Sequence, residues 1–358
     1  GTGGMSESHI KLYAASTSAD SVYFLDEGSV YFYASNADKY AISGKNLIIG
    51  STEIIMSRQL GIETERLETA VAAAGSLVKK IPVDKFLAGL KTFSFAINAS
   101  MVLAKQVYLT GEILQKNMIA LEGDEKKIRE IAVTYYSIVT RLKQEYDKRR
   151  IPWIKSLAEE FEATLIYKKG EALCKATEPV RMASSSQLSD KDVEFQRGAV
   201  ICEENTPGSE MYILRSGAVD VIVKGVRISI IDEPGTVIGE SSLLLGQKRA
   251  ATMIAKNTVI MTRIRKEDLK EVAEKQDDFL AGIAGTLARR HYYNLTRIEH
   301  VNKMLAEQSI DRELAGGGDK SVFIIKRASH DMHQLKEKIE DTVREKKADF
   351  LQYLVSTF

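Results

Sequence analysis

The sequence predicts an α+β fold in which two small β-barrels are joined and flanked by α-helices. Two stretches, 22–32 and 211–221, share a β-rich run, a glycine and a second run that alternates apolar and polar residues. Their similarity continues downstream, and the chain between and after the two copies carries apolar residues at near-helical spacing. The chain therefore repeats one β-rich unit, with helical sequence between and after the copies.

Each copy is predicted to hold a hairpin followed by further strands and a helix. Gly28 and Gly217 take the turn position between the two runs. Downstream, 66–72 lies over 249–255 without a gap, which predicts equivalent strands. A strand should then pass into a helix at a further matching pair, 81–86 and 264–269.

The segment 96–177 is predicted to be helical, because apolar residues recur at near-helical spacing over 97–107 and again over 128–139. Three residues are predicted to bend or break these helices: Gly111, Gly123 and Pro152.

The second copy follows a polar linker at 183–187 and leads into a helix over 266–308. A glycine-rich joint at 315–319 then precedes a terminal amphipathic helix, whose apolar stripe either meets a partner or covers the protein's own body. The predicted domains are 5–95, 96–177, 178–308 and 309–358.

Composition excludes several classes of function. The 358 residues are 44% hydrophobic and 28% charged with a formal net charge of +1, which does not fit a DNA-binding protein. Two cysteines without metal-ligand spacing fit a reduced, cytoplasmic setting. No apolar run approaches the ~20 residues that cross a bilayer. The residues before Met5 are interpreted as a cloning remnant, so we expect the native chain to begin there.

The stretch 238–252, IGESSLLLGQKRAAT, has the chemistry of a sugar-phosphate site. Gly239 lets the backbone approach an anion, and a short helical turn after it presents free N–H donors. Arg249 can form a charge-assisted contact to a phosphate. Glu240 would repel a phosphate, so we expect it to accept a hydrogen bond from a sugar hydroxyl.

The second copy resembles a cyclic-nucleotide-binding domain, and 239–252 resembles its phosphate-binding cassette. The resemblance covers about 75 residues, from the run 195–201 through Gly208 and the strand pair 211–221 to Leu269. It implies barrels of the jelly-roll type. It also implies that Glu240 holds the ribose 2′-hydroxyl and that Arg249 holds the cyclic phosphate. Backbone N–H donors would come from Gly239, Ser241, Ser242 and Ala250.

The resemblance also bears on which nucleotide is bound. Alanine after the cassette arginine is common in cAMP sites of this family, so Ala250 favours cAMP over cGMP. Ser241 and Ser242 depart from the family's usual Leu-Ala, a change that backbone donors tolerate.

The first copy departs further from the pattern. Gly50 and Arg66 are sixteen residues apart instead of ten, and serine replaces the acid after the glycine. Glu53 is a candidate substitute for that acid, while Glu68 stands ready to neutralise Arg66. Two readings stay open: a degenerate barrel used for contacts, or an altered second ligand site formed by Gly50, Glu53 and Arg66.

The helix after the second barrel carries two further candidates. In this family an apolar or aromatic residue of that helix often covers the base, and Tyr292 and Tyr293 are candidates here. The alternative is that both rings pack helix against barrel or form a dimer seam.

We therefore expect a non-catalytic, cytoplasmic sensor of a cyclic nucleotide, cAMP rather than cGMP, with no cofactor, metal site or catalytic residues. It would act on a protein partner, or on a second copy of itself, through its helices. The alternatives are a scaffold with vestigial barrels and a sensor of another anion, such as a cyclic dinucleotide.

Overall fold

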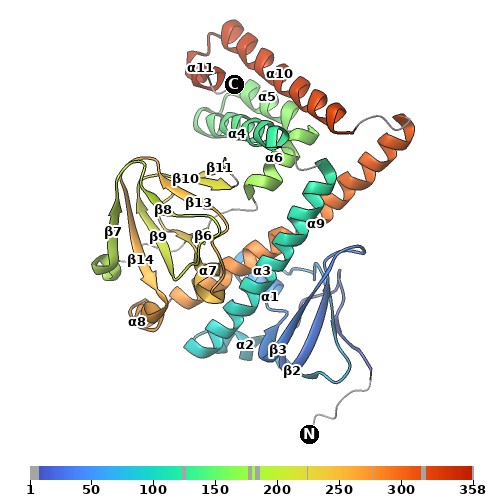
Figure 1. Ribbon diagram of the computed structural model, residues 1–358, viewed down its shortest axis with the longest axis vertical. Coiled ribbons are helices and arrows are strands. Elements are labelled where there is room, and N and C mark those ends of the chain that lie inside the picture. Colours follow the sequence, from blue (N-terminus) through green and yellow to red (C-terminus); the bar gives the residue numbers. More distant parts are fainter. Residues whose placement is uncertain are drawn as a thin grey trace. The chain divides into compact units, whose positions relative to one another are not determined.

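The computed structural model describes residues 8–122, 126–175, 180–181, 186–223, 225–276, 278–315 and 320–356. The chain forms two compact units (Figure 1). Unit 1 consists of Gly1–Asn117 and Glu178–Asn302, and unit 2 of Met118–Thr177 and Lys303–Phe358. The domain boundaries expected from the sequence stay a prediction.

The first barrel is a five-stranded antiparallel sheet in unit 1. Its order is β1-β4-β2-β3, and β5 also pairs with β2. The helix α1 (Thr52–Leu60) lies between β3 and β4, and α2 (Val83–Gly89) follows the last strand. The strands are β1 (Ile10–Tyr13), β2 (Ser21–Tyr33), β3 (Lys39–Ile49), β4 (Thr69–Ala72) and β5 (Leu77–Pro82).

The prediction of a hairpin turn at Gly28 is wrong, because β2 runs through this residue without interruption. The first half of β2 pairs with β5 and the second half with β4, so the strand changes partner at Gly28 instead of reversing. Gly28 has φ +135°, and a Cβ there would lie 2.3 Å from the Ser76 hydroxyl. Glycine is therefore needed for a close approach, and not for a turn.

The second barrel consists of two antiparallel sheets, ordered β11-β10-β13-β8 and β6-β12-β9-β14-β7. Gly217, at φ +94°, lies in the turn between β9 and β10, as predicted. The two strands do not form the expected hairpin, because they belong to different sheets of the barrel. Two α-helices accompany the described strands of this barrel: α7 (Glu240–Leu245) and α8 (Leu269–Lys275). The strands are β6 (Val180–Arg181), β7 (Asp192–Phe195), β8 (Val200–Cys202), β9 (Glu210–Ser216), β10 (Val219–Val223), β11 (Val226–Ile231), β12 (Thr236–Ile238), β13 (Thr252–Ala255) and β14 (Val259–Arg265).

The internal repeat is confirmed at the level of strands. The ungapped match of 66–72 with 249–255 places Thr69, which begins β4, over Thr252, which begins β13. Further along, β5 and β14 each lead into a helix, as expected. The two-barrel, α+β fold class predicted from the sequence is thus confirmed.

Two long helices bind the barrels of unit 1 together. They are α3 (Phe93–Glu122) and α9 (Phe279–Ala315), and both extend beyond this unit. Gly111 does not break the first of them, because α3 is continuous there, and a Cβ on Gly111 would meet only Asn294 at 3.9 Å. One apolar core joins the barrels through residues that include Ile54, Ile55, Leu103, Leu243, Ile283 and Leu287.

Unit 2 is made of helices. Pro152 begins α5, as the predicted break requires, whereas Gly123 lies outside the described residues. The terminal stripe covers the protein's own body, because Leu335, Ile339 and Leu354 are buried in the core of this unit. The helices are α4 (Lys126–Arg149), α5 (Pro152–Glu162), α6 (Leu165–Lys175), α10 (Lys320–Lys346) and α11 (Gln352–Val355).

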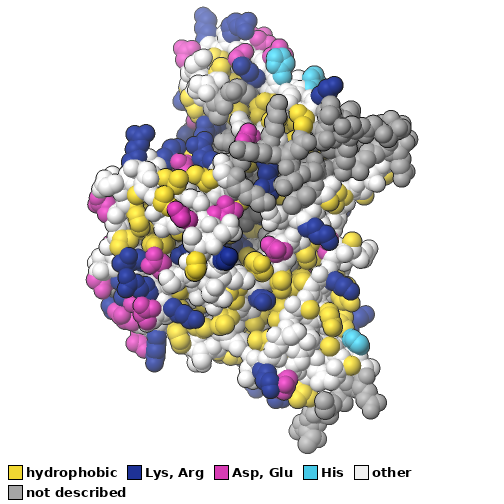
Figure 2. All heavy atoms as spheres, in the orientation of Figure 1, with side chains coloured by type: hydrophobic (Ala, Val, Ile, Leu, Met, Phe, Trp, Pro, Cys, Tyr) yellow, Lys and Arg dark blue, Asp and Glu magenta, His cyan; other side chains and the backbone are white. Residues whose placement is uncertain are grey.

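Within the described ranges, no single helix has the length and apolarity to cross a membrane. One pair of consecutive helices, Val83–Gly89 and Phe93–Met118, has the length and apolar composition of a membrane span when taken together, but the pair is bent by 107° at the break between them. On the face drawn in Figure 2, basic and acidic side chains are interspersed, which agrees with the formal net charge of +1.

Candidate functional site

The cassette of the second barrel is built around two glycines that make room for an arginine. Gly239 lies between β12 and α7 at φ +82°, and a Cβ there would lie 2.0 Å from Nη1 of Arg249. A Cβ on Gly208 would lie 2.9 Å from Nε of the same side chain. The guanidinium therefore lies directly against backbone, in space that any other residue would fill.

Arg249 is buried without an acidic partner. Its side chain donates to the carbonyl oxygens of Glu210, at 2.6 Å, and Gly239, at 3.5 Å. The residue is 6% exposed, and no carboxylate of the described residues forms an ion pair with it. A buried guanidinium held only by carbonyl dipoles is a strong site for an oxyanion.

Glu240 is fully buried, and only one of its two carboxylate oxygens accepts hydrogen bonds from the described residues. Oε1 accepts a hydrogen bond from Nη1 of Arg290 on α9, and a longer one from Ser241 at 3.4 Å. Oε2 has no hydrogen-bond partner among the described residues. An acceptor in this state can take a hydroxyl, since a buried carboxylate oxygen without a donor is costly.

The other residues expected in this cassette are placed as follows. Ser242 is buried, and Ser241 is half-buried. Ala250 is exposed and directly follows the buried Arg249. Leu243 and Leu244 of α7 belong to the shared core of unit 1, so the short helix is fixed by packing.

The two candidate cap tyrosines lie on α9, where their rings contact each other. Their ring centroids are 6.2 Å apart, and the Arg297 guanidinium lies 5.6 Å from the Tyr293 ring. Tyr293 is 37% exposed, and Tyr292 is half-buried. Their role as a cap over the base stays a prediction.

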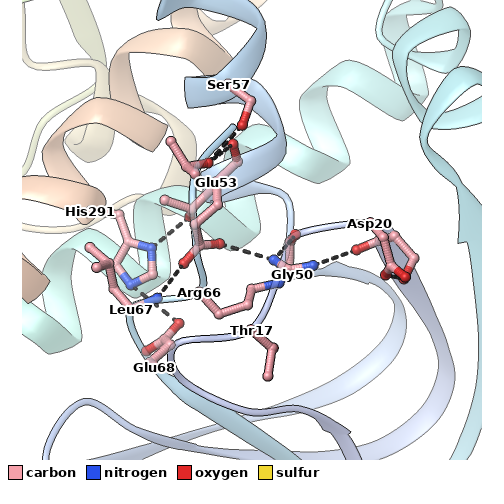
Figure 3. A network of polar contacts seen from close by, with 12 residues as sticks. Thr17, Asp20, Gly50, Glu53, Ser57, Arg66, Leu67, Glu68 and His291 are labelled. Atoms are coloured by element: carbon pink, nitrogen blue, oxygen red, sulfur yellow. Dashed lines mark hydrogen bonds and ion pairs between the residues drawn. The ribbon is translucent and has the colours of Figure 1, made fainter. Parts of the chain in front are cut away.

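The cassette of the first barrel holds a closed ion pair (Figure 3). Nη1 of Arg66 donates to the carboxylate of Glu53 at 2.9 Å and to the carbonyl of Gly50 at 2.7 Å. Its Nη2 donates to the carbonyl of Ser21 at 2.5 Å, and the guanidinium lies 4.1 Å from the Tyr13 ring centroid. Gly50, Glu53 and Arg66 are thus brought together as the sequence suggested.

The expectation that Glu68 neutralises Arg66 is wrong. Glu53 takes that role, because α1 begins two residues after Gly50 and its first turn lies over the arginine. Glu68 instead accepts hydrogen bonds from the hydroxyl of Tyr40 at 2.7 Å and from Gln106 at 3.3 Å. Burial raises the pKa of Glu68 well above its ordinary value, and the charge of Glu53 raises it further.

Two adjacent residues of α9 were missed as site residues. Arg290 pairs with Glu240 of the second cassette, and His291 reaches the first barrel. Nδ1 of His291 shares a hydrogen bond of 2.7 Å with Thr52 of α1, and Nε2 lies 3.1 Å from the hydroxyl of Tyr40. Burial lowers the pKa of His291 from 6.5 to about 3, so the ring is neutral. No local pattern marks these contacts, since the partners are far apart in the sequence.

Comparisons with known proteins agree with the geometry of the second barrel. The family model of the cyclic nucleotide-binding domain matches residues 192–276. A cGMP-dependent protein kinase of Toxoplasma gondii is 30% identical over 86 residues, which are 23% of this chain and 9% of that protein. A cAMP-dependent protein kinase regulatory subunit of Aspergillus fumigatus is 28% identical over 109 residues, which are 30% of this chain and 26% of the relative.

Among solved structures, the regulatory domain of Toxoplasma gondii PKA with cAMP is similar over 76% of this chain and 81% of that one, with 15% identity and a TM-score of 0.23. The chain spans well under half the length of the two kinase-related relatives above. The segment matched by the family model runs from β7 to the end of α8 and contains the whole cassette. The chain therefore contains a cyclic nucleotide-binding domain at residues 192–276.

Proposed function

We propose that the chain is a non-catalytic cAMP sensor whose ligand site is the cassette of the second barrel. One observation carries this proposal: among the described residues, Arg249 is buried with no acidic partner, and Oε2 of Glu240, in the same cassette, has no donor. The equivalent arginine of the first barrel, Arg66, is neutralised by Glu53. The two barrels thus differ in whether the arginine that a phosphate would contact is already paired with a carboxylate.

The chemistry of each group follows from its surroundings. The cyclic phosphate would pair with the Arg249 guanidinium and with the N–H of Ala250, replacing the weaker carbonyl contacts. A ribose hydroxyl would donate to Oε2 of Glu240 and satisfy its missing hydrogen bond. Ala250, as the residue after the arginine, supports cAMP over cGMP.

The same carboxylate supports a route for the signal. Glu240 holds Arg290 of α9 through its other oxygen, so ligand and helix share one side chain. A ligand that changes the strength of this ion pair would change the position of α9, but only by as much as its affinity differs between the two arrangements. The output would pass through α9 to a partner or to a second copy, in a cytoplasmic setting.

Calorimetry with cAMP, cGMP and cyclic di-AMP tests the proposal on the full chain. The Arg249→Ala variant removes the only buried cation of the cassette, so we expect cAMP affinity to fall at least about 100-fold. Arg227→Ala is the control, since Arg227 belongs to the same barrel and its side chain is 54% exposed.

The outcomes separate the alternatives. Binding of cAMP that survives Arg249→Ala would refute the cassette as the site. Tighter binding of cyclic di-AMP would support a cyclic-dinucleotide sensor, and the absence of binding by all three nucleotides would support a scaffold.

A further inference from the structure

The first barrel contains a carboxylate that receives two convergent donors. One oxygen of Glu53 accepts from Nη1 of Arg66 at 2.9 Å, and the other accepts from the backbone N–H of Leu67 at 3.1 Å (Figure 3). In the repeat, Arg66 and Leu67 correspond to Arg249 and Ala250. A side chain and the next N–H thus hold an anion in the first barrel, as they would hold a phosphate in the second.

We propose that Glu53 is an internal replacement for an oxyanion, so the first barrel holds an anion site occupied by its own side chain. Removal of the carboxylate would leave a site that accepts inorganic phosphate or acetate from solution. The inference concerns the other barrel, and it does not depend on which nucleotide the second barrel binds.

The guanidinium of Arg66 is fixed independently of Glu53. Its carbonyl contacts to Gly50 and Ser21 and its packing on the Tyr13 ring come from three other segments of the barrel. The side chain of Arg66 is 1% exposed. A cation held in this way keeps its direction when its anion is removed, which is the condition for binding an anion from solution.

Glu53 is held in place by the longer loop of this cassette. Between Gly50 and Arg66 the chain forms the nine-residue helix α1, where the second barrel has the six-residue α7. Thr64 donates to the carbonyl of Glu53 at 2.9 Å, which ties the end of the loop to the first turn of α1. The extra residues therefore close back on the helix and place the carboxylate against the arginine.

This arrangement changes the expected role of Glu53. Both of its oxygens are engaged at the anion position, so it does not stand in for Glu240 as an acceptor for a sugar hydroxyl. Ser51 occupies the position that corresponds to Glu240, and its buried hydroxyl has no partner among the described residues. Of the two readings left open by the sequence, the contacts favour a barrel that needs no ligand.

A self-occupied site would also hold α9 in place. Thr52, directly before Glu53, shares its hydroxyl with His291 of α9 at 2.7 Å. The ion pair at residue 53 therefore sets the position of the residue that contacts the long helix.

Thermal unfolding tests the inference in an Arg249→Ala background, where the cassette of the second barrel is disabled. The Glu53→Ala variant of this parent is compared in chloride, phosphate and acetate at equal ionic strength. Because it leaves a buried arginine unpaired, we expect Tm in chloride to fall by at least about 6 °C. Phosphate and acetate should restore part of this loss, so the variant should gain more Tm from these anions than the parent gains from their general stabilising effect. Glu63→Ala, at an exposed glutamate of the same loop, should behave as the parent does.

Three results would overturn the inference. The first is a Glu53→Ala variant that folds but gains no more Tm from phosphate or acetate than the parent does. The second is a variant that fails to fold in chloride and also in both oxyanions; folding only with an oxyanion would support the site. The third is a Glu53→Gln variant as stable as the parent in chloride, because the amide keeps the shape and removes only the charge.

Discussion

The ion pair between Glu240 and Arg290 can be measured by a double-mutant cycle. The Arg290→Met variant leaves a fully buried carboxylate with neither of its oxygens paired to a cation, since Oε2 already lacks a donor in the part of the chain that the structure describes. Breaking a buried ion pair from one side costs about 3–5 kcal/mol. The side chain of Arg290 is 22% exposed, so solvent weakens its ion pair with Glu240. We therefore expect Arg290→Met to lower the free energy of unfolding by about 3 kcal/mol, the lower end of this range.

The second substitution of the cycle, Glu240→Gln, removes the negative charge that Arg290→Met leaves without its cation. Combining Glu240→Gln with Arg290→Met replaces a stranded carboxylate by an amide, so the double variant should be more stable than the sum of the single changes predicts. We expect a coupling energy of at least about 1.5 kcal/mol. Urea unfolding of the four proteins, at one pH and without nucleotide, measures it.

Arg289 supplies the matched control for this cycle. It lies on α9 directly before Arg290 and is exposed, so Arg289→Met should change the free energy of unfolding by less than about 0.5 kcal/mol. Additivity of the Glu240 and Arg290 changes within about 0.5 kcal/mol would refute the pair as a structural link between the cassette and α9.

Three further predictions use other positions on the helices. His291 is neutral with a pKa of about 3, so its stabilisation is present above pH 6.5 and is lost as pH falls toward 3. Urea unfolding should show His291→Gln gaining about 2 kcal/mol relative to the wild type between pH 7 and pH 5; a constant difference would contradict this. Gly170→Ala places a Cβ 2.0 Å from the carbonyl of Ala132, so unit 2 should lose about 1–3 kcal/mol. Gly111→Ala, in an open stretch of helix, should raise the Tm.

The sequence predicts best what a short stretch of chain determines by itself. The cassette of the second barrel is contiguous, so its glycine, acid and arginine could be read together from one pattern. The repeat likewise placed β4 and β13, because an ungapped match transfers one strand onto the other.

Contacts between distant segments were not predictable in the same way. Gly28 was expected to turn, because nothing local reveals that β2 changes partner from β5 to β4. The choice between Glu53 and Glu68 as the partner of Arg66 depends on where α1 lies. Helical spacing predicted the helix after the second barrel, but not that adjacent residues of α9 would reach two different barrels.

The contacts of α9 also set the smallest fragment that could be moved into another protein. The segment matched by the family model ends at residue 276, so on its own it would lack Arg290 and strand the acid of its own cassette. Extending it to include α9 brings in His291, whose polar partners Thr52 and Tyr40 belong to the first barrel. Each longer fragment thus contains a polar side chain whose hydrogen-bond partner lies in a segment that the fragment lacks. A transplant that leaves none of these groups exposed or unpaired would have to carry both barrels, which ties the inheritance of the second barrel to that of the first.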